Sequence, residues 1–513
     1  MGRLDQGGCR RDRRKGTGPV HAASSGADRP RKGTGDRADA GLYGARSYSG
    51  PSARRDGMTE ITLYNTLTRE KAAFTPLDPE NIRIYACGPT VYDRIHVGNA
   101  RPIVVFDVLV RLLRHRFDKV TYVRNITDVD DKIIARAAER QIDIGGLCED
   151  TIRCFHQDIA ALGALPPDHE PRATEFIDDM IAMIATLIEK GHAYVAEGHV
   201  LFSVATMPSY GALSRRSMDD MIAGARVEVA PYKRDAADFV LWKPSSDDQP
   251  GWDNPFDSRK GRPGWHIECS AMARHYLGET FDIHAGGLDL VFPHHENEIA
   301  QSCCAHDTEI MATVWMHNGF VTMGDEKMSK SLGNMIRAHE AIAAHRGETV
   351  RAALLAAHYR APVALGDDAF AEARNVLDRL YRAAGTAKAD PAAIDDAFLA
   401  ALSDDLNTPA AMARLHELAG AANKGDGDAA IALRSSAGLL GLLERGAEEW
   451  ARGDRAGDAD GGLDEAAIEA QIAERKAARA GRDFARADAI RDELAAQGIT
   501  LEDGPEGTIW RRT

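Results

Sequence analysis

The chain has 513 residues and a formal net charge of −15, with 44% apolar and 27% charged residues. This composition is typical of a folded protein and excludes a chain that is disordered throughout or forms a collagen-like fibre. The acidic balance argues against a protein that holds nucleic acid through bulk positive charge, although it leaves room for a local basic surface.

The first 57 residues differ in character from the rest of the chain. They contain 13 Lys and Arg, six Asp and no Glu, and so carry +7, which leaves −22 on the other 456 residues. A segment so poor in apolar residues cannot bury enough surface to offset its ordering entropy, and it lacks the apolar core of a secretory signal. It is interpreted as a flexible appendage, a basic arm or a stretch upstream of a true start at Met58, and we favour the last.

No uninterrupted apolar run approaches ~18 residues, so the sequence predicts no membrane-spanning helix. The seven Cys stand at positions 9, 87, 148, 154, 269, 303 and 304. Their odd number and the lack of a secretory signal favour a reducing cytoplasm over a disulfide-bonded scaffold. The question that remains for these Cys is whether any of them binds a metal ion.

The first patterned elements form a strand–helix–strand unit. Residues 82–87 predict a buried strand that ends at a Gly-Pro break, and residues 119–125 predict a second strand. Between them, residues 102–115 predict a helix with its apolar positions on one face and a Pro near its first turn. Such a unit implies a parallel sheet.

Further elements follow in chain order. Residues 175–191 predict an amphipathic helix ended by Gly, inside a stretch over 171–231 that mixes short strands and turns and is interpreted as an insertion. The remaining predicted elements are strands at 238–242 and 281–284, Ala-rich helices from about residue 337, helices at 464–480 and 483–497, and a hairpin over 499–510.

Cys87, Cys269, His294 and Glu298 give the strongest metal signal in the chain. On a helix, His294 and Glu298 are four residues apart and share a face. Two thiolates, an imidazole and a carboxylate form a plausible zinc set. The alternative is that both Cys are buried core residues, since free Cys often packs as a small hydrophobe, and their long separation does not decide between the two.

Two further motifs suit a nucleotide. The run His96-Val-Gly98-Asn99 stands at the start of the predicted helix, where free amides bind phosphate and a Gly allows close approach, although a simple helix cap explains it as well. The run Lys327-Met-Ser-Lys330-Ser, followed by Gly333, suits charge on a transferring phosphoryl group. An exposed basic loop is the alternative, but the order of the two motifs favours a functional interpretation.

Together these blocks resemble the bacterial-type cysteinyl-tRNA synthetase family of class I aminoacyl-tRNA synthetases. Residues 96–99 are similar to the family's HIGH motif, with Asn99 in place of the final His, and residues 327–331 match its KMSKS motif letter for letter. The runs at 85–92, 125–131, 264–270 and 292–298 also resemble family blocks. The resemblance covers 58–513 and leaves out 1–57, which supports a start at Met58.

The resemblance implies an α/β fold: a Rossmann-like parallel-sheet catalytic domain split by a small insertion, an α-helical anticodon-binding domain and a small C-terminal α+β region. The expected divisions are a disordered basic extension over 1–57, two catalytic halves over 58–170 and 232–320, the connective insertion over 171–231, the KMSKS loop and stem-contact region over 321–373, a helical anticodon-binding bundle over 374–451, and an anticodon-recognition region over 462–513. We expect a cytoplasmic monomer with no membrane partner.

The resemblance also implies a two-step reaction. L-Cysteine and ATP with Mg²⁺ give cysteinyl-adenylate and pyrophosphate, and the cysteinyl group then passes to the 3′ end of tRNA(Cys). By the same resemblance, His96, Gly98, Asn99 and Lys330 bind ATP, with Lys330 stabilising the migrating charge and Lys327 assisting. The implied cysteine pocket consists of Gly88, Thr127, Trp265, His284 and Asp289, and the implied ligands of one Zn²⁺ per subunit are Cys87, Cys269, His294 and Glu298.

Zinc has a physical rationale in such an enzyme. Cysteine differs from serine in a single atom, and packing alone discriminates poorly between near-isosteres. Zinc binds a thiolate strongly and an alcohol weakly, so the metal itself selects the substrate. Without the resemblance, Thr127 and Trp265 could equally be core residues.

Two other functions stay open at this stage. A ligase that joins cysteine to an amino sugar would use the same adenylate but would lack a full anticodon domain. Here the C-terminal region continues to Thr513, and its basic residues over 475–482 together with an exposed Trp510 would suit unpaired bases. The alternative there is a solvated helix face with a packed Trp. A non-catalytic, zinc-stabilised RNA-binding protein would not need the two phosphate motifs.

Overall fold

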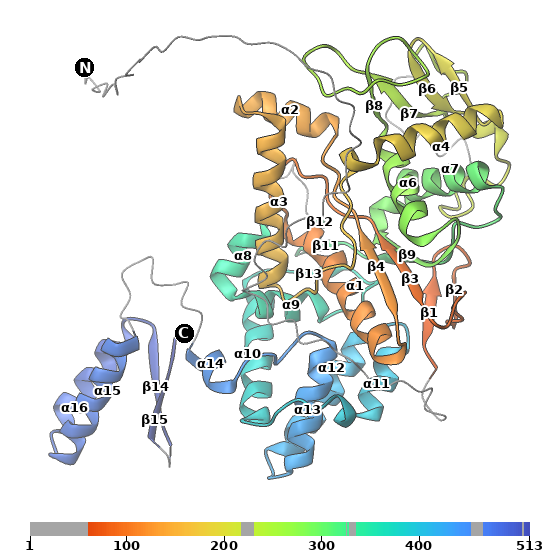
Figure 1. The fold of residues 1–513 in the computed structure, drawn as a ribbon. Helices are drawn as coiled ribbons and strands as arrows, with labels where there is room; N and C mark the ends of the chain where they lie inside the picture. Colours follow the sequence, from red (N-terminus) through yellow and green to blue (C-terminus); the bar gives the residue numbers. More distant parts are fainter. Residues whose placement is uncertain are drawn as a thin grey trace, which may run out of the picture. The chain divides into compact units, whose positions relative to one another are not determined.

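A computed structural model describes residues 60–216, 230–324, 326–327, 335–452, 465–504 and 507–512 (Figure 1). The predicted basic extension over 1–57 and Lys330 of the predicted phosphate motif lie outside these residues. For Lys327 the description extends to the backbone only.

A four-stranded parallel sheet lies at the centre of the catalytic half. Its strands are β3 (Ile82–Ala86), β4 (Val120–Arg124), β9 (Phe281–Gly287) and β10 (Ala312–Asn318), in the order β10-β9-β3-β4. Helix α1 (Val97–Arg116) connects β3 to β4. The predicted α/β fold, the βαβ unit and the strands at 82–87, 119–125 and 281–284 are therefore confirmed.

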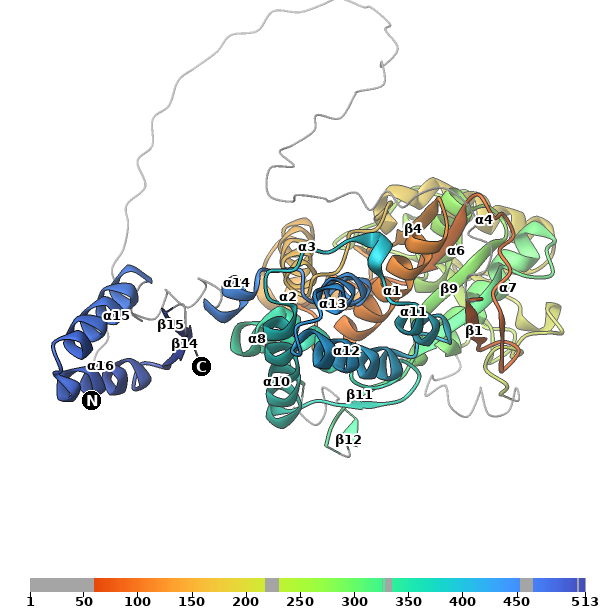
Figure 2. The same ribbon diagram turned by 90° about the horizontal axis from the view of Figure 1, so that it is seen from below.

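The alternation of side chains along the strands gives the sheet two buried faces. Ile82 and Ile84 point into a core that they share with α1, α8 (Ala338–His345) and α9 (Gly347–Leu355). Tyr85 and Val123 point into the other core, which they share with α4 (Ile177–Glu189), α6 (Trp265–Leu277) and α7 (Glu296–His306). Figure 2 shows α6 and α7 on the opposite side of the sheet from α8.

Helix α1 begins five residues earlier than predicted. The prediction placed its start at Pro102, whereas the structure begins it at Val97 with His96 as the N-cap. The reason is a capping box, in which His96 and Asn99 each accept a hydrogen bond from the other's backbone N–H. Pro102 consequently lies inside the helix, where it supplies no N–H to the carbonyl of Gly98.

A separate antiparallel sheet begins in the predicted insertion over 171–231 and extends beyond it, since two of its strands lie after residue 231. Its strands, in the order β5-β6-β7-β8, are β5 (Ala193–Ala196), β6 (His199–Phe202), β7 (Phe239–Pro244) and β8 (Gly261–Pro263). A short helix η1 (Ala173–Phe176) and α4 precede it, as the helix predicted at 175–191 requires. The strand predicted at 238–242 exists as β7, but it pairs with β6 rather than joining the parallel sheet, because periodicity predicts a strand and not its partner.

Two small sheets flank the parallel one. The hairpin β1 (Thr62–Asn65) and β2 (Glu70–Ala73) contacts β10, where the Asn65 side-chain amide donates to Thr313 O (2.9 Å). After β10, the strands β11 (Val321–Met323), β12 (Glu326–Lys327) and β13 (Val363–Ala364) form a sheet in the order β12-β11-β13. Strand β11 thus pairs with β12 on one side and with β13 on the other.

Helices make up most of the rest of the described chain. Helices α2 (Asp131–Arg140) and α3 (Ile144–Ala161) follow β4. Beyond β13 lie α10 (Asp367–Ala384), η6 (Pro391–Ala393), α11 (Asp396–Ser403), α12 (Thr408–Ala422), α13 (Gly427–Leu439) and α14 (Ala447–Arg452). The predicted helical region after residue 337 is confirmed.

Residues 465–512 have their own small core. Helices α15 (Glu465–Ala480) and α16 (Phe484–Ala495) pack with the antiparallel hairpin β14 (Ile499–Gly504) and β15 (Gly507–Arg512) around Ile468, Ile490 and Trp510. The prediction of an exposed Trp510 is wrong. Its side chain is 4% exposed and its Nε1–H donates to Glu469 Oε1 (2.9 Å), because the hairpin turns this face onto α15.

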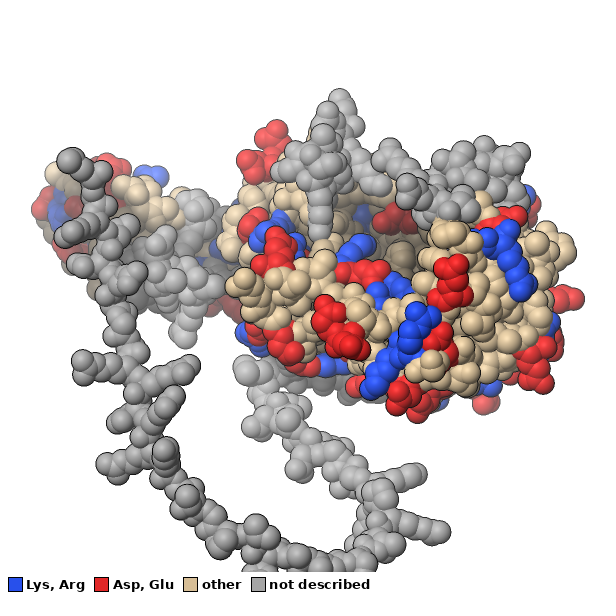
Figure 3. Space-filling model, turned by 90° about the horizontal axis from the view of Figure 1, so that it is seen from above, with Lys and Arg blue, Asp and Glu red and all other residues tan. Residues whose placement is uncertain are grey.

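On the face seen in Figure 3, Lys and Arg side chains are interspersed with Asp and Glu. The predicted absence of a membrane span agrees with the described helices, of which none is long and apolar enough to cross a bilayer. Local basic surfaces therefore remain compatible with an acidic chain.

Candidate active site

The four predicted metal ligands come together at the carboxyl end of β3. Cys87 directly follows β3, Cys269 lies on α6, and His294 lies in the short helix η4 (Val291–His295) that leads into α7, which carries Glu298. One ligand atom of each lies within 4.8 Å of the others, so the group could hold a metal ion. Strand β3 lies where the chain order of the sheet reverses, the usual place of a ligand site in such sheets.

The distances within this metal cluster are short. The Sγ atoms of Cys87 and Cys269 are 3.7 Å apart, and Cys269 Sγ lies 3.6 Å from Nε2 of His294. His294 Nε2 lies 3.0 Å from Oε1 of Glu298, as their spacing of four residues predicts. The alternative in which the two Cys are unrelated core residues does not explain this convergence of four donor atoms.

Burial favours the neutral forms of the two thiols and of the imidazole in the metal cluster. Desolvation, together with the neighbouring thiol and carboxylate, raises the pKa of Cys87 well above its usual value, and desolvation also raises the pKa of Cys269. Burial and the nearby rings of His266 and His284 lower the pKa of His294 well below its ordinary value. Neutral imidazole and buried thiols that converge on one point fit a soft divalent cation, which would remove the thiol protons on binding.

Neighbouring side chains orient these donors. His284, on β9, is fully buried and places its Nε2 2.9 Å from Oε2 of Glu298, the oxygen that does not face His294. The ring of Trp265 stacks on His294 with centroids 4.2 Å apart, and His266 Nδ1 lies 2.9 Å from His294 Nδ1. Groups that hold a ligand's other atom in this way fix its orientation toward a metal.

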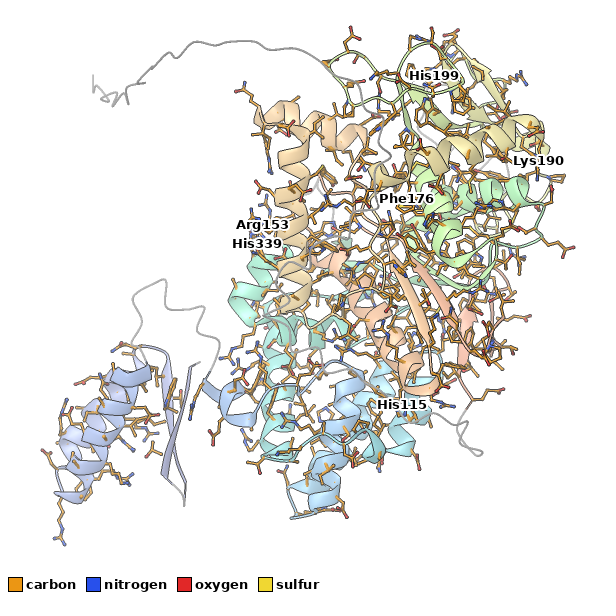
Figure 4. The ribbon with its side chains drawn as sticks, viewed as in Figure 1. His115, Arg153, Phe176, Lys190, His199 and His339 are labelled. Atoms are coloured by element: carbon orange, nitrogen blue, oxygen red, sulfur yellow. The ribbon has the colours of Figure 1, made fainter. Side chains whose placement is uncertain are left out.

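Helix α7 is also anchored at its far end. Lys190, which follows α4 and is labelled in Figure 4, donates from Nζ to the carbonyl of Ala305 (2.8 Å) and pairs with Asp307 (2.6 Å). The insertion's helix is thus fastened to the helix that carries Glu298. Phe176, at the start of that segment, packs edge-on against His275 of α6, the helix that carries Cys269.

His295 also lies beside the metal cluster, although the sequence alone did not identify it as a candidate ligand. Cys87, His284, His295 and Glu298 form a second group of donor atoms within 4.8 Å, which shares two members with the first. His295 Nδ1 lies 2.8 Å from His317 Nε2, whose ring continues to Thr66 at 2.8 Å. The sequence signal was the adjacent pair 294–295, but helical spacing pointed only to the first of the two.

The predicted cysteine pocket surrounds the metal cluster in part. Gly88 donates its N–H to Asn125 Oδ1 (2.8 Å), and a Cβ there would lie 1.6 Å from Asn125 O, so only Gly fits. Thr127 is buried and its hydroxyl donates to Glu268 Oε2 (2.8 Å), next to Cys269 in the chain. Asp289 is exposed in the short helix η3 (Leu288–Leu290), directly after β9. The roles of these residues stay predictions.

The predicted phosphate motif at the start of α1 is a well-formed helix N-terminus. Asn99 N donates to Nδ1 of His96, and His96 N donates to Oδ1 of Asn99, each at 3.3 Å. The helix cap that the sequence left open is therefore present. A cap and a phosphate site are compatible, because the first-turn amides not used in the cap still point out of the helix end.

The two nucleotide motifs meet through their flanks. Val97 N donates to Ile336 O and Ala338 N donates to Ile95 O, each at 3.0 Å, which makes an antiparallel bridge between His96 and Arg337. Residues 336–338 follow the Lys327–Ser331 motif closely in the chain. The chain just after the second motif is thus paired with the start of α1, which carries the first motif more than 200 residues earlier in the sequence.

Comparisons with known proteins agree with this geometry. The family model "tRNA synthetases class I (C) catalytic domain" matches residues 73–375, the DALR domain matches 397–444, and the "cysteinyl-tRNA ligase anticodon binding domain" matches 460–511. The cysteine–tRNA ligase of Rhodospirillum rubrum is 58% identical over 461 residues, which cover 88% of this chain and 99% of that protein. The cysteine–tRNA ligase of Gluconobacter oxydans is 58% identical over 453 residues, covering 88% and 98%.

Among solved structures, the chain is similar to methionyl-tRNA synthetase of Mycobacterium tuberculosis in complex with methionyl-adenylate. The TM-score is 0.52 at 14% identity, with 70% of this chain and 89% of the other covered. At that identity the similarity bears on the fold alone, and it agrees with the parallel sheet and the helices described above.

Proposed function

The chain belongs to the cysteinyl-tRNA synthetase family, and from that premise we propose that it activates L-cysteine with ATP and transfers the cysteinyl group to tRNA(Cys). The observation that carries the proposal is the metal cluster of two thiols, an imidazole and a carboxylate at the carboxyl end of β3. The helix that follows β3 carries the first nucleotide motif at its start, and that start pairs with residues 336–338 just after the second motif.

The reaction needs no nucleophile from the protein. In the first step a carboxylate oxygen of cysteine bonds to the α-phosphorus of ATP, and pyrophosphate leaves. In the second step a hydroxyl of the terminal ribose bonds to the carbonyl carbon, and AMP leaves. The protein's task is therefore to position the reactants and to stabilise developing charge.

We assign that task to the α1 end and to the two Lys of the second motif. The first-turn amides of α1, with Gly98 giving close access and His96 and Asn99 at the cap, bind the phosphates of ATP with its Mg²⁺. Lys330 stabilises the charge that migrates to pyrophosphate, and Lys327 assists. The start of the second motif is anchored to the fold, because the backbone of Lys327 pairs with Thr322 of β11, the first strand after β10.

The metal proposed for the cluster is one Zn²⁺, held by Cys87, Cys269, His294 and Glu298. When bound, it supplies a site that takes a thiolate in preference to an alcohol, and so separates cysteine from serine. The chain's own contribution is to hold the donors: His284 keeps Glu298 in place, and Trp265 and His266 keep the ring of His294 oriented.

The remaining residues of the pocket have two kinds of role. Gly88 leaves room at the end of β3, and we propose that Asp289, exposed directly after β9, and Trp265, stacked on His294, contact the substrate. The hydroxyl of Thr127 donates to Glu268, so we propose that Thr127 positions this carboxyl in the wall of the pocket and does not contact the substrate. Burial raises the pKa of Glu268 well above its usual value, which fits a protonated side chain within the wall.

The parts outside the catalytic half are proposed to bind tRNA. Residues 321–373 contact the tRNA stem. Residues 374–451 and 462–513 bind the anticodon side of the tRNA, in keeping with the family matches at 397–444 and 460–511. Because Trp510 is packed, base contacts in the last region fall to other side chains. We also infer that the enzyme is a monomer and works in the cytoplasm.

The decisive experiment is cysteine-dependent exchange of pyrophosphate into ATP, with serine in place of cysteine as the control. We expect exchange with cysteine and little with serine. Charging of total tRNA with labelled cysteine then tests the second step. An enzyme that supports exchange but charges no tRNA would contradict the proposed acceptor, and one that supports no exchange would contradict the activation step.

A further inference from the structure

Arg101 is a buried cation between the two nucleotide motifs. It lies on α1, two residues after Asn99, and its side chain is 0% exposed. Its guanidinium donates to three backbone carbonyls, those of Phe320 (2.7 Å), Ala361 (2.6 Å) and His358 (3.3 Å). Among the described residues, no carboxylate lies within ion-pair distance of it.

Such an arrangement is unusual for a residue whose role is stability alone. Burying a guanidinium costs free energy that carbonyl dipoles offset only in part, and buried charges are normally paired with an opposite charge. Desolvation lowers the pKa of Arg101 to about 10, so the side chain is still charged at neutral pH. An apolar side chain of the same size would fill the space but could not connect three separate carbonyls.

The three carbonyls belong to the segments that lead into two neighbouring strands, β11 and β13. Phe320 directly precedes β11, and Ala361 lies just before β13, which pairs with β11 in parallel. The two segments approach closely there: Val363 N donates to Phe320 O (3.0 Å), and a Cβ at Gly319 would lie 2.7 Å from Ala361 O. Arg101 therefore fastens this pair of strands to α1 at one point.

The strands that Arg101 holds lead directly to the second nucleotide motif. Strand β11 turns into β12, whose last residue is Lys327, the first residue of the motif, and Thr322 pairs with Lys327 across that turn. On the α1 side, Arg101 lies in the first two turns of the helix, five residues after His96 and two after Asn99. A single side chain thus connects the helix that carries one motif to the hairpin that introduces the other.

We propose that Arg101 is a positioning residue for cysteine activation, which sets the β11–β12 hairpin, and with it Lys327, relative to the N-terminus of α1. The proposal rests on the proposed function, since it concerns ATP bound between the two motifs. The planar fork of N–H groups on Arg101, and not its charge alone, fixes the position of the hairpin relative to α1. One rigid guanidinium plane holds all three carbonyls, which lie just before the two strands.

The test compares Arg101→Met and Arg101→Lys with the unaltered enzyme. For Arg101→Met we expect kcat for cysteine-dependent pyrophosphate exchange to fall about 100-fold, as for other small displacements of positioned groups. Zinc stoichiometry and the dissociation constant for cysteine should stay within about 2-fold, because the metal cluster lies on β3, α6 and α7 and shares no contact with Arg101. Arg101→Lys should lie in between, since an ammonium reaches fewer of the carbonyls.

A control variant separates positioning from loss of stability. Leu415→Ala creates a cavity beside α12, a helix that carries neither motif and on which Leu415 is fully buried. Compared at equal fractions of folded protein, Leu415→Ala should keep its exchange rate while Arg101→Met does not. Equal rates for all variants, or an equal loss in Leu415→Ala, would overturn the proposal. If Arg101→Met does not fold, Arg101→Lys decides the question. A full exchange rate in Arg101→Lys would overturn the proposal, and a fall in its kcat without a change in cysteine binding would support it.

The outcome is distinguishable from failure of the proposed function. If the unaltered enzyme shows no cysteine-dependent exchange, the function is wrong whatever the variants do. If the unaltered enzyme is active and the variants lose cysteine binding together with kcat, Arg101 supports the whole domain, and the positioning role is wrong.

Discussion

Two buried clusters of ionisable side chains lie on opposite faces of the parallel sheet. One consists of donor groups that could bind a cation, and the other of charged groups that are already paired with one another. In the metal cluster, burial raises the pKa of Cys87 and Cys269 and lowers that of His294, so these groups are neutral donors. In the second cluster, Asp107 on α1 lies between Arg111 and Arg351, and its charge is already paired. We call the second one the Asp107 cluster.

In the Asp107 cluster, the carboxylate and both guanidinium groups have hydrogen-bond partners within the protein. Arg351 donates to the carbonyls of Leu440 (2.6 Å) and Leu162 (3.2 Å) as well as to Asp107, and Arg111 donates to Gly438 O (3.0 Å). Burial alone would raise the pKa of Asp107, but Arg351 and Arg111 bring it below the usual value. This cluster needs nothing from outside, and it ties α1 to the helical half.

The comparison teaches that burial of titratable groups does not by itself identify a site. What distinguishes the metal cluster is that its lone pairs converge on one point, and no Lys or Arg of the described residues forms an ion pair with it. A cation from outside would therefore complete it, whereas a cation could only disturb the Asp107 cluster. The predictions below test this difference, beginning with the largest expected effect.

Cys269→Ser should abolish function without unfolding the chain. A hydroxyl is a poor ligand for zinc, so we expect bound zinc to fall to a small fraction of one per chain and cysteine-dependent exchange to fall at least about 100- to 1,000-fold. Zinc is measured by mass spectrometry of native protein and exchange by labelled pyrophosphate. Cys304→Ser, on α7 but outside the cluster, is the matched control and should keep both. Stoichiometric zinc in Cys269→Ser would disprove the ligand assignment.

Asp107→Asn should do the opposite, with a large loss of stability and an intact site. The Asn leaves Arg351 buried without a counter-charge, at a cost of about 3–5 kcal/mol in the free energy of unfolding. Urea unfolding measures the loss, and zinc content of the folded fraction should not change. A loss of zinc without a loss of stability would mean that the two clusters do not have the separate roles assigned here.

His284→Gln should weaken the metal cluster without destroying it. His284 contacts Glu298 but is not one of the four proposed ligands, so its loss should weaken zinc binding by about 10- to 100-fold. Competition with a chelator measures the affinity. His199→Gln, on β6 and labelled in Figure 4, changes a histidine of the insertion and should leave the affinity unaltered. Equal affinities in both variants would remove His284 from the site.

Acid should distinguish the unaltered chain from Asp107→Asn. The folded-state pKa of Asp107 is lowered, so its contribution to stability is fully present above the unfolded pKa and is lost as pH falls through the folded one. The difference in unfolding free energy between the two chains should be constant above about pH 5 and shrink below about pH 4. Unfolding in urea at several pH values measures it, and a difference that grew in acid would reverse the sign of the assigned shift.

Local patterns predicted one cluster well and could not predict the other. His294 and Glu298 are four residues apart, so helical spacing alone placed them on one face. The two Cys were already candidate ligands, but only the family resemblance favoured that role over a place in the core. Asp107 and Arg351 are 244 residues apart, and nothing in the sequence pairs them. The partner of β7 and the burial of Trp510 were missed for the same reason, because strand pairing and packing depend on contacts between distant segments. The start of α1 was within reach, since His96 and Asn99 form a local capping box.

The smallest effect is expected at a third kind of charge pair. Arg153 on α3, labelled in Figure 4, lies 2.7 Å from Asp150, with side chains that are 63% and 72% exposed. Water screens such a pair and its long side chains lose entropy on pairing, so Arg153→Ala should leave the melting temperature, zinc content and exchange rate within experimental error. Raising the salt concentration should not change this result. A measurable destabilisation would show that an ion pair on this protein can stabilise it without burial, and burial would then no longer explain why the Asp107 cluster contributes to stability.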